Sequence, residues 1–474
     1  MHKINIKTSR NHEKRQIENM EKSENKIKKF LKDQKMKFFA LTISGKISFI
    51  FLRVSILSII IFAMELIVAL AVPSWSILDM PLIFDRVDSF MDFFNVGGFV
   101  SQMNPYNHPH YSSYPPLALL FSKLFSFFIP YNEHPMIVRD TVLGGFGYGC
   151  FIVISVTVLL VLFKIYCNRN NINLKTYILY SIIILSSFPF LFMFIRGNNI
   201  IISLIFTVVF MLFYNSESKV KREIALISLA IASALKLYPI IFIVVLFRKK
   251  MFWGILRTAV YAVILFFIPF IFFNGGFNNI PLFFENLSSF SKTNLIYHNE
   301  SFFLITKGFI AAFDLLGWPI VIVEIIEIIF KIIFVVAAAI GFLYAKKSWH
   351  LSAVCFLCLT LFPYPSNTYV FIFSVIPLFQ FLNDKDKTKK DYFFLIVFLI
   401  TLMPIQLGFI NQRLSPPFWF ATNCVLIMIS NITMFIVLVV MSFKNMIEKF
   451  KNKKLFDIFD LEEDIASIES NIES

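Results

Sequence analysis

Long uninterrupted apolar runs are the feature that most limits what this chain can fold into. A run of about 18 or more apolar residues is long enough to cross the hydrocarbon core of a bilayer as a helix. The chain is also 57% hydrophobic, which is more than an ordinary soluble domain contains. The sequence therefore predicts an all-α, polytopic integral membrane protein. The clearest runs are 47–72, 142–166, 253–273, 319–345, 391–410 and 419–443.

Positive charge gathers at the two ends of the chain. Residues 1–37 contain twelve Lys and Arg against five acids, and residues 444–454 contain five lysines. Basic residues that flank membrane spans mark the cytoplasmic side. Nucleic-acid binding would require a folded basic surface or interleaved aromatic residues, which the sequence lacks. We therefore expect a basic cytoplasmic segment (1–45), a transmembrane domain (46–443) and a cytoplasmic tail (444–474).

Shorter apolar segments are paired across polar breaks. Residues 224–247 are flanked by "SESKVKRE" and "FRKK", so both flanks are expected on the cytoplasmic side. This segment should then be a hairpin of two short helices that turns at Lys236. Pro239 supports the break, because proline cannot continue one helix and can begin the next. The same argument places Arg196, in "RGNN", at a second outer turn.

The membrane topology follows from counting these segments. About thirteen are visible, but an odd number would place the basic C-terminus outside the cell. We therefore expect about twelve transmembrane helices, with one misassigned segment in 114–166, where 115–130 could be a partly embedded helix. Two large outer loops result, at 73–114 and 274–318.

The first outer loop contains carboxylates at Asp85, Asp88 and Asp92. Ionisable groups close to the membrane are costly and usually face a cavity or a partner. We expect these acids to face Arg196 and Lys236 across an outer cavity. Such an arrangement suits a reaction on a lipid-linked phosphate, because the cations can hold the phosphate and a carboxylate can act as general base.

Five motifs lie in order within residues 50–410. The first combines an acid, Asn-Pro-Tyr and Tyr-Pro-Pro in the first outer loop, and the others lie at the two turns, in the second outer loop and near the last spans. The five are "MDFFNVGGFVSQMNPY" with "YPPLALLF", "RGNNIIISLIF", "ASALKLYPIIFI", "HNESF" and "LFPYPSNTYVFIFSVIPLF". Together they resemble the motifs of glycosyltransferase family 87, which belongs to the GT-C superfamily of membrane enzymes.

The resemblance implies a GT-C fold and transfer of mannose or another hexose. The donor would be a polyprenyl-phosphate sugar, and the acceptor a glycan or glycolipid outside the cell membrane. Transfer would be an inverting single displacement with Asp92 as catalytic base. Arg196 and Lys236 would bind the donor phosphate. The expected substrate-binding residues are Tyr106, Tyr114, Asn198, His298, Asn299 and Tyr369.

Simpler interpretations exist for the charged candidates. Asp92 could cap the helix that follows it, and Asp85 or Asp88 could be the base in its place. Arg196 and Lys236 could extend their charged ends to the membrane interface without binding a substrate.

No metal or other cofactor is expected. His108 and His110 flank a proline, and no third ligand is evident nearby. Cys355 and Cys358 form a C-x-x-C inside an apolar run, which is typical of small buried thiols in a span.

Two functional alternatives remain open from the sequence. Family members often have a histidine where this chain has Asn367 or Tyr369, so the resemblance leaves the sugar and the acceptor open. A transporter or flippase for a lipid-linked or anionic substrate is the main alternative, because broken helices and charges within the membrane also suit transport. A polymerase or ligase of surface polysaccharide on a related scaffold is a third possibility.

Overall fold

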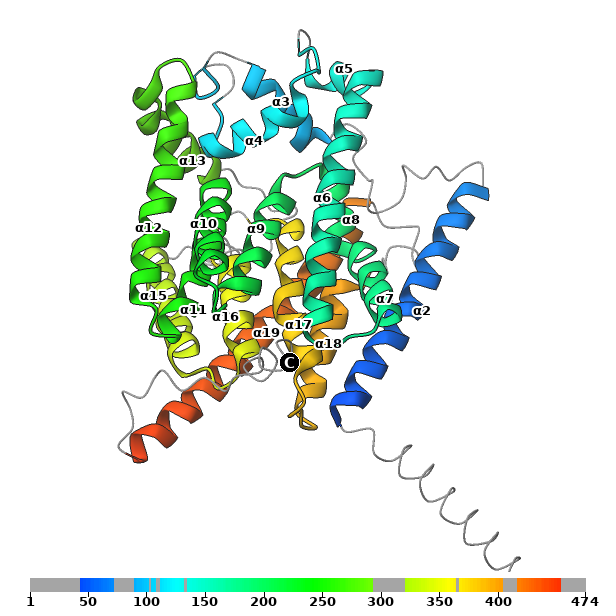
Figure 1. The fold of residues 1–474 in the computed structure, drawn as a ribbon, viewed down its shortest axis with the longest axis vertical. Helices are drawn as coiled ribbons and strands as arrows, with labels where there is room; N and C mark the ends of the chain where they lie inside the picture. The colour runs from blue at the N-terminus through cyan, green and yellow to red at the C-terminus, as the bar shows by residue number, and fades with distance from the viewer. Residues whose placement is uncertain are drawn as a thin grey trace, which may run out of the picture.

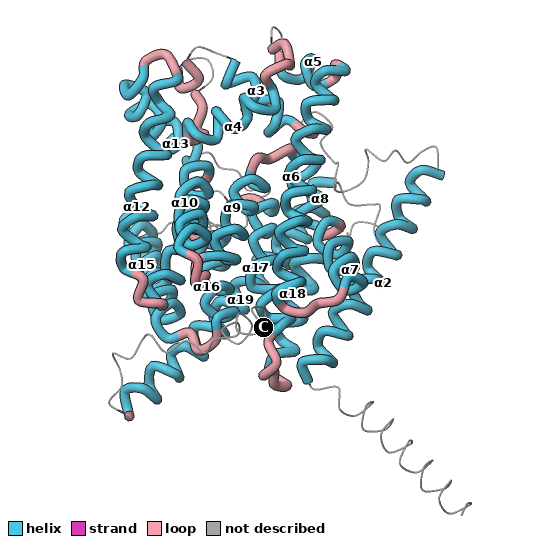
Figure 2. Tube along the Cα trace, in the orientation of Figure 1, coloured by secondary structure: helices cyan, strands magenta, loops and turns pink. Residues whose placement is uncertain are grey.

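The computed structural model describes residues 43–71, 89–101, 104–107, 111–131, 134–292, 320–363, 366–403 and 416–452. These residues fold into helices joined by short loops, and the described ranges contain no strand (Figure 2). The α-helices are α2 (Ile43–Ala71), α3 (Met91–Ser101), α4 (Pro116–Ser126), α5 (Pro135–Arg139), α6 (Val142–Arg169), α7 (Leu174–Leu185), α8 (Phe188–Arg196), α9 (Ile200–Phe213), α10 (Lys219–Leu235), α11 (Ile243–Arg248), α12 (Phe252–Phe267), α13 (Asn279–Lys292), α15 (Ile320–Tyr344), α16 (Ser348–Leu361), α17 (Val375–Asn383), α18 (Asp391–Leu402) and α19 (Pro416–Lys451). Short 3₁₀ helices are η3 (Tyr238–Phe242), η4 (Ile268–Phe272), η5 (Gly276–Asn278) and η6 (Thr368–Ser374).

The long helices form a bundle with two different ends. Figure 1 shows α6 and α12 running along the bundle, with α3, α4, α5 and α13 gathered at one end, which we call the α3 end. The opposite end carries many lysines and arginines, and we call it the basic end. Three hydrogen bonds tie helix termini together there. They run from Asn383 to Asn170, from Arg248 to the Ala345 carbonyl, and from Asn445 to the Tyr344 carbonyl.

The structure confirms the hairpin at Lys236. Helix α10 ends at Leu235, and η3 begins at Tyr238 with Pro239 in its first turn. Ser216 precedes α10 and Lys249 follows α11, and both residues line one cavity at the basic end. The chain therefore leaves the basic end through α10, reverses at Lys236 and returns through α11.

The break at Arg196 is also present. Helix α8 ends at Arg196 and α9 begins at Ile200. The guanidinium of Arg169, the last residue of α6, donates a hydrogen bond to the Leu212 carbonyl near the end of α9. Helix α9 therefore returns to the basic end, and Arg196 lies at the far end of this second hairpin.

Among the described residues, five helices are long and apolar enough to cross a membrane, or six if the bent pair α7 and α8 counts as one span. The long ones are Gly45–Met64, Val142–Arg169, Phe252–Phe272, Ile325–Tyr344 and Val425–Lys451. Helices α4, α9, α16 and α18 are shorter apolar helices, as are the segments Tyr238–Arg248 and Thr368–Asn383. An integral membrane protein is thus supported, and the total of twelve spans stays a prediction.

The expected span 391–410 is described only through Met403. Helix α18 ends at Leu402, and Met403 is extended, as expected for a residue before a proline; residues 404–410 lie outside the described residues. The segment 115–130 contains only the 11 helical residues of α4. A helix of that length covers roughly 17 Å, about half of the hydrocarbon core. This finding supports the interpretation of 115–130 as a partly embedded helix.

Candidate active site

Asp92 lies in the first turn of α3, which packs against the Arg196 turn. The backbone N–H of Phe90, just before α3, donates a 2.6 Å hydrogen bond to the carbonyl of Ile195. Phe90 adopts φ 64°, which is uncommon outside glycine. The backbone contact thus joins the start of α3 to the end of α8 and fixes where the Asp92 side chain points.

Both carboxylate oxygens of Asp92 have partners from the turn sequence "RGNN". Nη2 of Arg196 donates to Oδ1 at 2.7 Å, and Nδ2 of Asn198 donates to Oδ2 at 2.7 Å. The carbonyl oxygen of the buried Asn198 side chain accepts from the backbone N–H of Ile200, which fixes the amide orientation. Asp92 therefore binds side chains of the turn, and Arg196 touches it directly instead of lying across a cavity from it.

The turn requires Gly197 for this contact. Gly197 ends α8 in the left-handed conformation at φ 68°, which costs other residues energy. A Cβ at this position would lie 2.9 Å from the Cβ of Phe93 and 3.1 Å from the Phe90 carbonyl oxygen. Glycine thus permits both the reversal of the chain and the close approach of α3.

Lys236 lies at the other hairpin and approaches the same region. It ends α10 with an extended backbone at φ −144°. Its ammonium lies 4.5 Å from the centroid of the Tyr114 ring, a cation–π contact. Its charge also interacts with that of Asp92. The structure therefore brings Asp92, Arg196, Lys236 and Tyr114 together from four separate parts of the chain.

The electrostatic environment of Asp92 suits proton transfer. Burial raises the pKa of Asp92 to about 6, while the Asn198 hydrogen bond and the charge of Lys236 act in the opposite direction. At neutral pH the carboxyl is then mainly ionised. It is nevertheless more basic than an ordinary aspartate, which favours a role as general base.

The aromatic candidates occupy different places. Tyr369 interacts electrostatically with Asp92, its hydroxyl accepts a 2.8 Å hydrogen bond from Asn367, and its ring stacks on Phe192. Tyr106, in contrast, is fully buried, and its hydroxyl donates to the Tyr114 carbonyl at 3.2 Å. Tyr369 therefore lies at the site, whereas Tyr106 supports the loop that carries Tyr114.

Several candidates lie outside the described residues. They are Asp85, Asp88, His108, His110, His298 and Asn299. The C-x-x-C cysteines, by contrast, are described. Cys355 and Cys358 are free thiols buried in α16, as expected.

Sequence reasoning missed Asn199. This residue and Asp92 line the same small cavity, of about 10 Å³, which has room for about one water molecule. Both polar atoms of the Asn199 side chain are buried and have no hydrogen-bond partner. A buried amide without partners is costly, so Asn199 is a further candidate for substrate contact. The signal was available, because Asn199 follows Asn198 in "RGNN".

Comparison with known proteins agrees with this geometry. The sequence model of glycosyltransferase family 87 matches residues 112–363, which is more than half of the chain. No curated protein matches. The match covers the Tyr114 loop, both hairpins and Lys236, and it supports a transferase over a transporter. The chain belongs to glycosyltransferase family 87, and it is a membrane glycosyltransferase.

Proposed function

We propose that this enzyme transfers mannose or another hexose from a polyprenyl-phosphate donor to a glycan or glycolipid acceptor. The observation that carries this proposal is the contact of Asp92 with Arg196 beside Lys236, at the end of the bundle opposite the basic end. One carboxylate and two cations in one place match the needs of sugar transfer from a phosphate.

Asp92 acts as the general base in a single displacement. It takes the proton of the acceptor hydroxyl as that oxygen attacks the anomeric carbon. The bond between the anomeric carbon and the phosphate oxygen breaks, and polyprenyl phosphate leaves with the electron pair. Attack and departure occur on opposite faces of the sugar, so the anomeric configuration is inverted.

Lys236 and Arg196 stabilise the negative charge that develops on the leaving phosphate. The ammonium of Lys236 contacts the face of Tyr114, so a phosphate can approach it from the side away from the ring. Nη2 of Arg196 contacts Oδ1 of Asp92, and the positive charge of the guanidinium is spread over all three of its nitrogens. These residues supply the positive charge, so the proposed mechanism uses no metal or other cofactor.

Neighbouring side chains hold the sugar and the base. Asn198 positions Asp92 through its 2.7 Å hydrogen bond. Asn199 lines the small cavity beside Asp92, Tyr114 contacts Lys236, and Tyr369 interacts electrostatically with Asp92. His298 and Asn299 remain predicted substrate contacts from the second outer loop.

The charge distribution indicates the orientation in the cell membrane. Basic residues gather at the end opposite Asp92, and such residues favour the cytoplasmic side. We therefore propose that the Asp92 site faces the extracytoplasmic side, where a polyprenyl-phosphate sugar and a surface glycan can meet.

The decisive experiment incubates the purified enzyme with several polyprenyl-phosphate sugars and candidate acceptors. The expected result is release of polyprenyl phosphate with one donor, accompanied by an inverted glycosidic product. The Asp92→Asn enzyme serves as the blank, because it keeps the shape of the site and loses the base. A product with retained configuration, or equal release by the blank, would contradict the mechanism.

A further inference from the structure

The loop that carries Tyr114 is held by a helix from a distant part of the chain. Helix α13 lies with α3 and α4 at the α3 end of the bundle (Figure 1). The side chain of Asn286 on α13 is buried, and its Nδ2 donates to the carbonyls of Tyr106 at 2.9 Å and Ser112 at 3.2 Å. Because an asparagine amide has two hydrogens, one side chain joins the two sides of this loop.

A second asparagine of α13 holds the start of the same loop. Asn279, the first residue of α13, accepts a 2.9 Å hydrogen bond from Nδ2 of Asn104. The side-chain oxygen of Asn104 accepts in turn from the backbone N–H of Tyr106 at 3.0 Å. Asn279 is itself fixed, because its amide donates to the Asn274 carbonyl at 2.9 Å. We call Asn279 and Asn286 the α13 clamp.

The clamped loop residues bind Tyr114 directly. The Tyr106 hydroxyl donates to the Tyr114 carbonyl at 3.2 Å. The hydroxyl oxygen of Ser112 accepts from the backbone N–H of Tyr114 at 3.3 Å. The Tyr106 ring is fully buried, which fixes the direction of its hydroxyl group. Both backbone polar groups of Tyr114 are therefore held by residues that the α13 clamp holds.

Tyr114 in turn orders the ammonium of Lys236. The ammonium lies 4.5 Å from the centroid of the Tyr114 ring. A lysine side chain has a flexible four-carbon stem, so the cation–π contact limits the positions that its charge can take. A loop that moved away from α13 would carry the ring with it, and the ammonium would lose this fixed position.

We propose that Asn286 and Tyr106 are positioning residues, which hold the Tyr114 ring against Lys236. The effect passes from α13 through the loop 104–114 to the cation. Tyr106 thereby has a role in the reaction that differs from the substrate contact expected from the sequence. This inference rests on the proposed function, because Lys236 is the residue proposed to bind the donor phosphate.

The first measurement is amide hydrogen exchange of the purified full chain in phospholipid nanodiscs, which needs no donor. Asn286→Leu keeps the approximate size of the side chain and removes both hydrogen bonds. Exchange should then become about tenfold faster in peptides that cover residues 104–114 and in those that cover the Lys236 turn. Tyr106→Phe removes only the hydroxyl group and should act in the same direction. The unfolding midpoint shows whether each variant is folded.

The second measurement is turnover with the polyprenyl-phosphate sugar that the wild-type enzyme uses. Asn286→Leu and Tyr106→Phe should each slow turnover by about five- to tenfold, since each loosens the position of a charge-stabilising group. In a Tyr114→Leu background the ring is already gone, so Tyr106→Phe should cause no further loss. A role confined to the stability of the fold would not produce this dependence on Tyr114.

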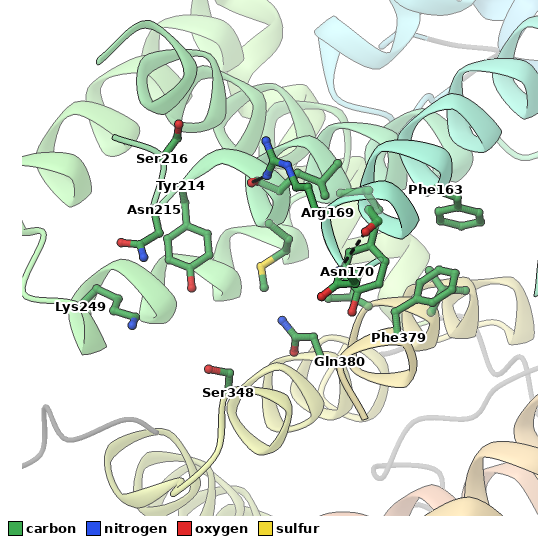
Figure 3. Close-up of a pocket in the computed structure, with 16 residues that line it drawn as sticks. Phe163, Arg169, Asn170, Tyr214, Asn215, Ser216, Lys249, Ser348, Phe379 and Gln380 are labelled. Atoms are coloured by element: carbon green, nitrogen blue, oxygen red, sulfur yellow. Dashed lines mark hydrogen bonds between the residues drawn. The ribbon is translucent and has the colours of Figure 1, made fainter. Parts of the chain in front are cut away.

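Tyr214→Phe is the matched control for Tyr106→Phe. Tyr214 lies at the basic end of the bundle, where it lines a separate cavity with Lys249 and Ser348 (Figure 3). Neither Asn286 nor Tyr106 lines that cavity. The same chemical change at Tyr214 should therefore leave both the loop exchange and the turnover unchanged.

The outcomes separate the positioning role from its alternatives. Faster exchange at both the loop and the Lys236 turn, with rate losses that do not add to that of Tyr114→Leu, supports the role. Unchanged exchange overturns it, and so do a rise confined to the loop and losses that add. If no donor supports turnover in the wild-type enzyme, the proposed function fails, and exchange at the Lys236 turn still decides whether the clamp reaches the cation. If Asn286→Leu fails to fold, Tyr106→Phe decides alone.

Discussion

Two ion pairs at opposite ends of the bundle have the same length and different surroundings. Asp92 meets Arg196 at 2.7 Å at the α3 end, and Asp384 meets Lys347 at 2.7 Å at the basic end. Asp384 also accepts hydrogen bonds from the Trp349 indole and from the backbone N–H of Asp386. Burial raises the pKa of Asp384, but these donors outweigh burial and the net shift is downward.

The comparison separates a structural carboxylate from the proposed catalytic one. The pKa of Asp92 is raised to about 6, so this group is poised to accept a proton near neutral pH. The donors around Asp384 make it a poor base. They also let it join Lys347 and Trp349, near the start of α16, to the end of α17. Ion-pair length alone would not have distinguished these roles.

The largest expected effect comes from Asp92→Asn. This change keeps the shape of the side chain but removes the base, so transfer should fall by roughly a hundredfold or more. The measurement is the rate of polyprenyl phosphate release, with donor binding determined separately. Donor binding should survive, since the cations are untouched.

Asp384→Asn is the matched control. Breaking this buried pair should lower the unfolding free energy by about 3 kcal/mol while the folded enzyme keeps its rate. Equal losses of rate in the two variants would end the distinction between the two carboxylates.

The next effect concerns Lys236→Ala. Loss of one group that stabilises transition-state charge costs about 100-fold in turnover, and that is the fall we expect. Lys346→Ala, an exposed lysine at the basic end, should leave turnover unchanged. Normal turnover by folded Lys236→Ala protein would remove Lys236 from phosphate stabilisation.

The sequence predicted the hairpins and the grouping of Asp92 with Arg196 and Lys236, but it did not predict the direct ion pair between Asp92 and Arg196. Basic flanks and Pro239 locate the Lys236 turn, because topology and proline chemistry are local properties. The contact between Asp92 and Arg196 joins residues 104 positions apart. It depends on how α3 packs, which no local pattern encodes.

Tyr106 is a second residue whose contacts the local sequence pattern did not predict. Its position in "NPY" suggested a substrate contact, yet its ring packs against Phe270, Phe273 and Phe283. The amide of Asn286 on α13 also donates to the Tyr106 carbonyl. A residue of a motif can therefore serve the loop that presents the site, and the sequence does not show which residues do so.

A pH profile tests the two carboxylates in one enzyme. Protonation of Asp92 removes the base, so transfer should fall as pH drops through about 6, by roughly tenfold per unit below it. The folded pKa of Asp384 lies below its ordinary value of 3.8, so its stabilising effect is present above pH 3.8 and is lost only at lower pH. Between about pH 4 and 6 the enzyme should therefore lose rate while circular dichroism and unfolding midpoint stay unchanged.

Asn198→Ala tests whether Asp92 is the group that sets the midpoint of this pH profile. The Asn198 hydrogen bond lowers the pKa of Asp92, so its removal should move the midpoint of the rate profile to higher pH. An unmoved midpoint would show that another group controls the profile.

The smallest expected effect is that of Gly197→Ala, which tests the backbone that holds Asp92 at Arg196. An alanine at φ 68° costs about 1–2 kcal/mol, and its Cβ would press against Phe93 and the Phe90 carbonyl. Because α3 must then shift, the unfolding midpoint should fall and the transfer rate should fall with it. Gly149→Ala is the control, since a Cβ there meets nothing within 4 Å and helical alanine is favoured. If Gly197→Ala lost stability but kept its full rate, the close approach of α3 would serve the fold alone, and Asp92 would tolerate a looser position than its two 2.7 Å hydrogen bonds imply.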